Sequence, residues 1–137
     1  MNKVLLVCFL FFSLQGAPWR ESKSFTLAKD QLVKILVKSE GQERMLSWRW
    51  TLYTDKGLVV HENFDRFVGQ HILTLEYHQA FRKRLLGALK SENDVPYGIV
   101  VFKKFDDKNK TATFDFLLID KEKRVVLDYV TKKEERQ

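Results

Sequence analysis

Apolar residues recur at every second position in four separate stretches of this chain. Around Trp48, for example, the apolar side chains alternate with Ser47 and Arg49. Successive side chains of a β-strand point to opposite faces, so each stretch places its apolar members on one face of a sheet. A sheet with one buried face and one hydrated face is typical of antiparallel pairing, and the alternation therefore predicts an all-β protein. The alternating apolar residues are Val33, Ile35 and Val37; Leu46, Trp48, Trp50 and Leu52; Ala112, Phe114, Phe116 and Leu118; and Val125, Leu127 and Tyr129.

Short polar segments separate the alternating stretches, as hairpin turns do. One of them, Thr54-Asp55-Lys56-Gly57, ends in a glycine, which is free to adopt the positive φ that tight turns require. The sequence therefore predicts strands joined mainly by hairpins. We expect strands over residues 31–38, 44–53, 58–64, 71–77, 97–105, 111–119 and 124–130, and a further short strand near residues 25–27.

Residues 79–90 fit two structures. Phe81, Leu85 and Leu89 recur at every fourth position, which favours a short amphipathic helix. Gly87 weakens that helix by about 1 kcal/mol relative to alanine. Alternatively, this segment continues the sheet as another strand that ends near residue 86. Both alternatives remain open from the sequence.

Seven or eight antiparallel strands must each hide one face from water. Two architectures achieve this: a sandwich of two sheets, and a single meandering sheet that closes into a barrel. Short hairpin connections suit both, and we favour the sandwich. The predicted fold class is thus a small antiparallel β-sandwich or meander barrel, with or without one short helix near residues 79–90.

The first seventeen residues have the layout of a cleavable secretory signal peptide. Lys3 supplies a positive charge, an apolar run covers residues 4–14, and the small residues Gly16 and Ala17 follow. The apolar run is shorter than the roughly 20 residues of a membrane-spanning helix, so we expect no transmembrane segment. We expect residues 18–137 to form a single exported domain.

Cleavage after residue 17 also removes Cys8, the only cysteine of the chain. The mature domain then has no disulfide to stabilise it. Small eukaryotic domains that fold outside the cell usually contain disulfides, so their absence favours the bacterial periplasm. We therefore expect a periplasmic location.

The formal net charge of the chain is +6, but acidic and basic residues are interleaved over most of its length. Two short basic clusters stand out, at Arg82-Lys83-Arg84 and at Lys132-Lys133. Because an exported protein rarely meets nucleic acid, the partners that these clusters suggest are anionic lipid head groups, cell-wall polymers or an acidic protein. A solubilising surface is the simpler interpretation.

Asp107-Lys108-Asn109-Lys110-Thr111 contains an acceptor sequence for N-glycosylation, Asn-x-Thr without proline at x. The acidic residue two positions before the asparagine resembles the extended acceptor pattern of bacterial periplasmic N-glycosylation. We expect the segment at an exposed hairpin tip, so Asn109 is a candidate glycosylation site. An ordinary polar turn of aspartate and asparagine has the same composition.

Trp48 and Trp50 share one face of a predicted strand, and Arg49 points to the other face. If that face were open, the two rings would be able to stack on a sugar or hold a cation. The neighbouring Leu46 and Leu52 on the same face favour the core instead, because large aromatic side chains on an alternating strand normally pack inside.

The sequence contains no recognisable catalytic, cofactor or metal motif. His61, His71 and His78 lack the spacing of a zinc site, and a regular strand would point the last two to opposite faces. No serine lies in a nucleophile-elbow sequence, and the two pairs of neighbouring acids fall in a turn and in the tail. We expect a non-enzymatic protein without cofactor or metal.

These expectations favour an accessory or scaffold subunit of a bacterial envelope assembly that acts through protein–protein contact. The edge strands of a sandwich can accept a strand from a partner. We expect residues 64–69 to form a loop. Either the loop supplies aromatic and arginine side chains, the kinds that dominate interface energetics, or its phenylalanines pack into the core. The candidate partner-contact residues are Phe64, Arg66, Phe67, Arg82, Lys83 and Arg84.

Two alternative functions remain. A barrel lined by the many phenylalanine and tryptophan side chains would bind a small apolar ligand. A hydrolase acting on cell-wall material ranks last, because the sequence offers no acid and base that can be paired.

Overall fold

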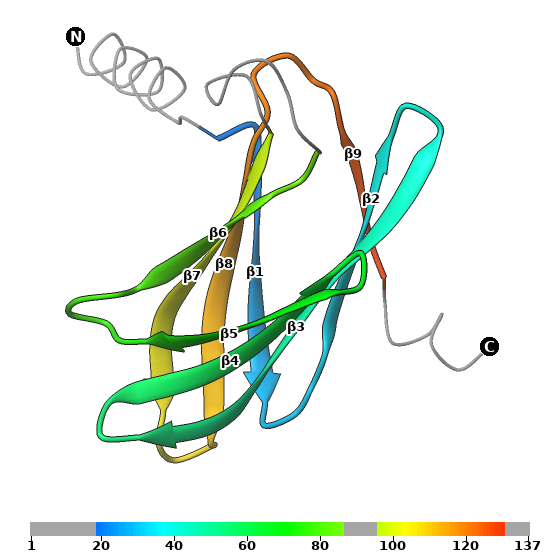
Figure 1. Cartoon of the computed structure of the whole chain (residues 1–137). Coiled ribbons are helices and arrows are strands. Elements are labelled where there is room, and N and C mark those ends of the chain that lie inside the picture. Colours follow the sequence, from blue (N-terminus) through cyan, green and yellow to red (C-terminus); the bar gives the residue numbers. More distant parts are fainter. Residues whose placement is uncertain (1–18, 87–95, 131–137) are drawn as a thin grey trace, which may run out of the picture.

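The computed structural model describes residues 19–86 and 96–130, which form nine antiparallel β-strands in two facing sheets and no helix (Figure 1). One sheet has four strands in the order β1-β8-β7-β6, and the other has five in the order β5-β4-β3-β2-β9. One hydrophobic core lies between them. The strands are β1 (Glu21–Ala28), β2 (Val33–Ser39), β3 (Gln42–Thr54), β4 (Gly57–Phe64), β5 (Phe67–Leu73), β6 (Ala80–Arg84), β7 (Tyr97–Asp106), β8 (Thr111–Ile119) and β9 (Val126–Tyr129).

The predicted fold class is confirmed, and of its two versions the structure has the sandwich. β8 begins and ends at the predicted residues, and β2, β3, β4, β7 and β9 each begin and end within two residues of prediction. β1 is longer than the short strand expected near residues 25–27. Residues 80–84 form β6, so this part of the 79–90 segment is a strand, whereas residues 87–90 lie outside the described part.

The loop predicted at residues 64–69 is wrong, and the strand predicted at residues 71–77 lies four residues earlier than expected. β4 continues to Phe64, the turn contains only Asp65 and Arg66, and β5 already begins at Phe67. Both turn residues have positive φ, 50° and 77°, as type I′ two-residue hairpins require. Such turns usually carry Asn-Gly or Asp-Gly, and an aspartate followed by arginine gives no comparable signal.

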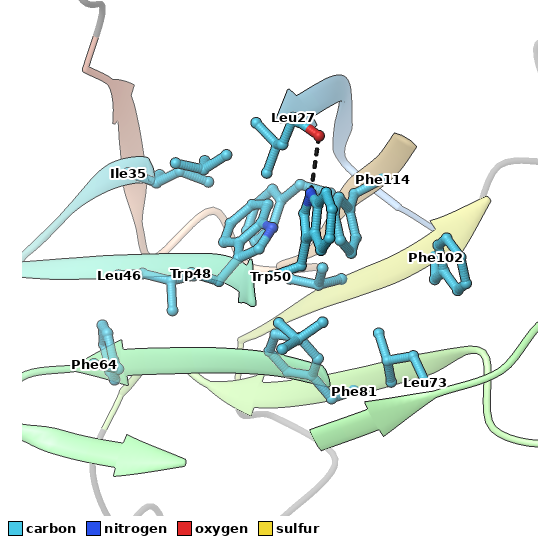
Figure 2. Close-up of a cluster of buried hydrophobic side chains, with 14 of the residues drawn as sticks. Leu27, Ile35, Leu46, Trp48, Trp50, Phe64, Leu73, Phe81, Phe102 and Phe114 are labelled. Carbon is cyan, nitrogen blue, oxygen red and sulfur yellow. Dashed lines mark hydrogen bonds between the residues drawn. The ribbon is translucent and has the colours of Figure 1, made fainter. Parts of the chain in front are cut away.

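The two tryptophans of β3 pack between the sheets (Figure 2). The ring of Trp48 stacks on Phe116 of β8 with centroids 6.0 Å apart and meets Phe25 of β1 edge-on at 5.5 Å. The indole nitrogen of Trp50 donates a 2.8 Å hydrogen bond to the carbonyl oxygen of Leu27. The prediction that both tryptophans belong to the core is confirmed.

Leu52 does not lie on the predicted inner face. The register between β3 and β4 shifts between Trp50 and Leu52, and the leucine is 51% exposed. One extra residue in a strand moves the side chains that follow to the opposite face. Tyr53 therefore takes the inward position, where its ring stacks on Phe105 with centroids 3.9 Å apart.

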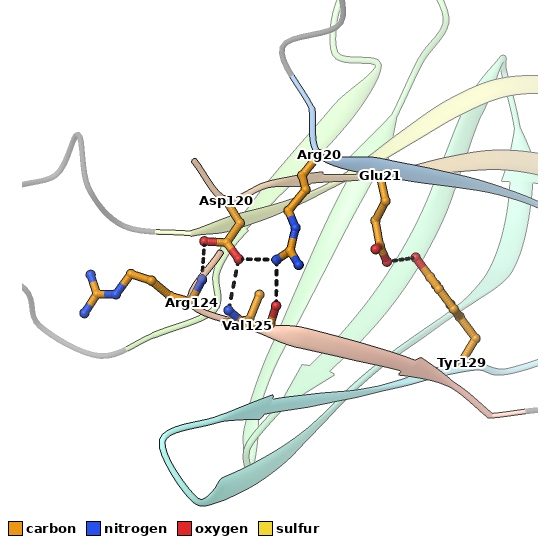
Figure 3. A network of polar contacts seen from close by, with 6 residues as sticks. All are labelled: Arg20, Glu21, Asp120, Arg124, Val125 and Tyr129. Atoms are coloured by element: carbon orange, nitrogen blue, oxygen red, sulfur yellow. Dashed lines mark hydrogen bonds and ion pairs between the residues drawn. The ribbon is translucent and has the colours of Figure 1, made fainter. Parts of the chain in front are cut away.

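Polar contacts around Asp120 connect the start of β1 to the segment between β8 and β9 (Figure 3). The buried Asp120 carboxylate accepts hydrogen bonds from the Arg20 guanidinium and from the main-chain nitrogens of Arg124 and Val125. The Arg20 guanidinium also donates to the carbonyl oxygen of Val125 at 2.8 Å. This network fixes the crossover from one sheet to the other.

Tyr129 of β9 strengthens the same side of the sandwich. Its hydroxyl donates a 2.9 Å hydrogen bond to the Glu21 carboxylate of β1, and the Lys23 ammonium lies 4.4 Å from its ring centroid. Burial, together with the neighbouring Glu21 carboxylate, raises the pKa of the Tyr129 hydroxyl above its ordinary value. The β1–β9 side of the sandwich is therefore closed by polar and aromatic contacts.

Candidate interaction surface

β5 ends the five-stranded sheet on the opposite side of the sandwich from β9 (Figure 1). Within the described residues, β4 is the only strand that pairs with it. Three of its apolar side chains are largely exposed: Phe67 by 72%, Val68 by 79% and Ile72 by 58%. An exposed apolar edge of this kind is where other chains add strands.

The other edge strands of the described chain all carry charges, and β5 does not. β1 contains Glu21 and Lys23, β6 contains three consecutive basic residues, and β9 contains Asp128. Charged side chains on an edge are a common protection against unwanted strand pairing. β5, with the sequence FVGQHIL, contains no aspartate, glutamate, lysine or arginine and so lacks this protection.

The apolar surface continues from β5 across the outer face of its sheet. Ile72 lies opposite Val59 of β4, and Val59 lies opposite Leu52 of β3. The bulge in β3 therefore places Leu52 at the end of a three-strand apolar row. A partner that pairs with β5 would meet this row as well as the main chain.

A hollow of about 200 Å³, here called the Phe67 hollow, opens between the β4–β5 turn and the end of β6. Its apolar lining includes Phe64 and Phe67, and its charged lining includes Arg44, Lys83 and Arg84. Asp65 is the acidic residue of the lining, 3.6 Å from Arg44. The hollow thus combines aromatic rings with a mainly positive rim.

The structure brings four of the six candidate contact residues to this hollow. Phe64 is buried in its floor, while Phe67 is exposed at its rim. Lys83 and Arg84 join it from the other sheet, although they follow Phe67 by 16 and 17 positions in the sequence. The remaining two lie elsewhere: Arg66 is the exposed second residue of the turn, and the Arg82 guanidinium lies over the Tyr97 ring at 4.7 Å.

Lys83 also belongs to a polar cluster that the sequence did not predict. Its ammonium donates a 2.9 Å hydrogen bond to Glu62, which is only 4% exposed and points inward from β4. The His71 ring of β5 stacks on Phe81 of β6 with centroids 4.2 Å apart. Gly69 lies opposite Glu62, and a side chain at this position would clash with the Glu62 carboxylate. The cluster joins the two sheets directly behind β5.

Two titratable side chains of this cluster, His71 and Glu62, are only loosely placed against each other. His71 Nε2 lies 3.6 Å from Glu62 Oε1, which is too long for a hydrogen bond. The described residues contain no group of three or more histidine, cysteine or acidic side chains that could hold a metal ion. The contacts of this cluster hold β6 against β4 and β5.

A larger hollow of about 400 Å³ lies at the other end of β5. Tyr53 and the segment from Thr74 to Tyr77 line it. Tyr77 is 90% exposed, so the hollow is a shallow surface feature. Apart from the exposed Trp19 and Phe67, the tryptophan and phenylalanine rings that would line a ligand cavity pack between the sheets instead.

Asn109 lies at the tip of the β7–β8 hairpin, where it was expected. Its side-chain nitrogen, the atom that a glycan would occupy, is exposed and donates a 2.8 Å hydrogen bond to Asp106. Glycosylation remains a prediction. Mass spectrometry of the protein from its native host is the test, and a peptide carrying only unmodified Asn109 would contradict it.

Three predicted features lie outside the described residues, wholly or in part: the signal peptide at residues 1–17, the basic pair Lys132-Lys133 and residues 87–90 of the segment predicted as helix or strand. Within residues 19–86 and 96–130, no helix has the length and apolar character of a membrane span. Comparison of the sequence with protein-family models and with curated proteins, and of the chain with solved structures, found no match.

Proposed function

We propose that this chain is an exported, non-enzymatic β domain that works through protein–protein contact, as an accessory or scaffold subunit of a bacterial envelope assembly. The observation that carries the proposal is the uncharged and exposed edge of β5. The composition of residues 1–17 supports export, and the loss of Cys8 with that segment supports a periplasmic location.

Two features of the β5 side suit a protein partner. Unpaired main-chain groups along an edge strand bind an added strand without regard to its sequence. The Phe67 hollow adds selectivity, because an exposed aromatic side chain on a rim that carries more basic than acidic residues favours a partner with apolar and acidic residues. Anionic lipid or cell-wall polymer remains the alternative partner for the cations alone.

The two alternative functions have weaker support. A ligand-binding barrel requires a closed sheet, whereas the described strands form two separate sheets with aromatic side chains packed between them. A cell-wall hydrolase requires an acid and a base beside a substrate cleft, and the buried Glu62 is instead engaged by Lys83.

Affinity isolation from the envelope of the native host, after mild crosslinking, tests the proposal. Wild-type protein should capture a distinct envelope protein, and the Val68→Lys variant, which puts a charge on the β5 edge, should lose it. The matched control is Val126→Lys, the same substitution at a 61% exposed residue of β9 in the same sheet, which should capture the partner normally. Circular dichroism should show that both variants are folded.

Two results would contradict the proposal. One is isolation of this chain alone, with no second protein crosslinked to it. The other is a partner that Val68→Lys captures as well as the wild type does, since contact would then lie away from β5.

A further inference from the structure

We propose that the strand that pairs with β5 is the β5 strand of a second copy of this chain, so that two sandwiches share one continuous sheet. The inference rests on the proposed function and gives the β5 edge itself to the second copy. The envelope protein then contacts the apolar row and the Phe67 hollow of the paired sandwiches, and Val68→Lys loses it by breaking the pair. The basis of the inference is that β5 is complementary to itself in main-chain direction, in side-chain pattern and in charge.

The main-chain groups that β5 leaves free follow from its turn. In a two-residue hairpin the residues that flank the turn bond to each other, so the main chain of Phe67 faces β4. Alternation then directs Gly69, His71 and Leu73 toward β4 as well. The main-chain N–H and C=O groups of the other three residues, Val68, Gln70 and Ile72, face away from the sheet.

If the two-fold axis that relates the two copies passes through Gln70, the outward-facing main-chain groups of all three residues form hydrogen bonds. In that register Gln70 lies opposite its own copy, and Val68 lies opposite Ile72 of the second copy. Each of these pairs is of the hydrogen-bonded kind, and each exchanges two main-chain bonds. If the axis passed through Gly69 or His71 instead, that residue would form a non-hydrogen-bonded pair with its own copy, and only two of the three outward-facing residues would find a partner within β5.

The side chains of β5 are also nearly palindromic about Gln70. On the outer face, the β-branched Val68 and Ile72 pair across the axis, a combination that stabilises antiparallel strands. On the inner face, Phe67 lies opposite Leu73 of the second copy, and the small Gly69 lies opposite the His71 ring. Apolar residues thus meet apolar residues at both ends of the pairing.

Charge also distinguishes β5 from the other three edge strands as a candidate for self-pairing. Self-pairing of β6 would bring its three consecutive cations against those of the second copy, and self-pairing of β1 or β9 would also bury charges. Self-pairing of β5 places no two charged side chains opposite each other, because His71 lies opposite Gly69 in this register. A two-fold pairing also uses both β5 edges, so the assembly closes at two copies instead of growing into a fibre.

Sedimentation equilibrium of the purified wild-type chain is the first test. At about 100 μM a pair with a micromolar dissociation constant is almost fully dimeric, so the mass should be twice that of one chain. Val68→Lys and Gln70→Pro should each weaken the association about tenfold or more. Proline is tolerated on an edge strand where its nitrogen faces outward. Gln70→Pro should therefore leave the thermal stability of the monomer unchanged. Val126→Lys should remain a dimer.

Disulfide trapping tests the register. In a Cys8→Ser background, Gln70→Cys places two cysteines opposite each other across the axis, within the separation that a disulfide spans. Mild oxidation should link this variant into a covalent dimer. Ile72→Cys, whose copies lie about 13 Å apart in the same register, should remain unlinked.

A monomeric wild-type chain at this concentration, or equal linkage of both cysteine variants, would overturn the inference. Failure of the dimer and failure of the proposed function are distinguishable. A monomer that still captures an envelope protein through Val68 would mean that another protein supplies the strand. A dimer that captures no second protein would leave the self-pairing intact and contradict the role as an assembly subunit.

Discussion

The Lys83 ammonium of β6 and the Glu62 carboxylate of β4 form a 2.9 Å ion pair that links the two sheets behind β5. The Glu62 side chain is 3% exposed, and its second oxygen has no hydrogen-bond partner in the described part of the chain. Removing one partner of such a pair leaves a buried charge uncompensated, whereas replacing both partners by apolar groups is close to neutral.

Lys83→Met should therefore lower the free energy of unfolding by about 3 kcal/mol, and the double variant Glu62→Leu/Lys83→Met should be within about 1 kcal/mol of the wild type. Urea denaturation gives both values. Lys38→Met, which removes an exposed pair with Asp128, is the control and should change stability by less than about 0.5 kcal/mol. A double variant as unstable as the single one would show that the pair has a role beyond charge compensation.

Among the polar residues at the β1–β9 side of the sandwich, Asp120 is the one whose substitution we expect to destabilise the protein most. Asp120→Ala removes the acceptor of three hydrogen bonds and leaves the Arg20 guanidinium without its carboxylate. We expect a loss of about 3 kcal/mol, measured by thermal or urea unfolding. Asp107→Ala, which removes an exposed 3.8 Å pair with Lys110, should unfold as the wild type does. Similar unfolding of the two variants would contradict a structural role for the Asp120 network.

Gly98 of β7 lies directly under the ring of Phe116. A methyl group at this glycine would come within 2.8 Å of two carbon atoms of that ring. Gly98→Ala should therefore destabilise the protein by about 2 kcal/mol through overpacking.

Replacing the Phe116 ring by a smaller side chain distinguishes crowding from a backbone effect at Gly98. The double variant Gly98→Ala/Phe116→Leu should lose less stability than the sum of its two single variants. Gly41→Ala, at a positive φ of 76° with no neighbouring atom within 4 Å, should cost about 1 kcal/mol through backbone strain alone. Strict additivity at residues 98 and 116 would rule out crowding.

The strands that the sequence predicts best are those whose signal is local. In β8, Ala112, Phe114, Phe116 and Leu118 are all buried, as their alternation indicates. The alternation alone decides which face of such a strand is apolar. The strand can therefore be recognised without knowing which sheet covers that face. The fold class therefore follows from the sequence, whereas the order of the strands in each sheet does not.

The features that sequence reasoning missed depend on single residues in unusual conformations or on distant partners. Asp65 and Arg66 adopt the positive φ of a tight turn without glycine, so the start of β5 was placed too late. The Phe67 hollow joins segments from two sheets, which no local pattern reveals. Glu62 did carry a signal, because it occupies an inward position between Val60 and Phe64, and a charge in such a position predicts a buried partner.

Asp106 offers a prediction about pH. The hydrogen bond from the Asn109 side chain, followed by the one from the Asn109 main-chain nitrogen, holds the pKa of the Asp106 carboxyl below its ordinary value of 3.8. Because the pKa is lower in the folded state, the ionised carboxylate contributes to stability above about 3.9, its value in the unfolded chain. That contribution is lost as the pH falls through the lowered folded value.

Asn109→Ala should consequently raise the pKa of Asp106 toward 3.8, and NMR titration of the side-chain carboxyl carbon measures the change directly. Lys108→Ala is the matched control, because it keeps the main-chain nitrogen that also donates to Asp106 at 3.0 Å. The control should titrate as the wild type does. If Asp106 titrates at the same pH in the wild type and in Asn109→Ala, the hairpin tip does not hold the hydrogen bonds described for it, and the exposed nitrogen of Asn109 is not tied to this carboxylate.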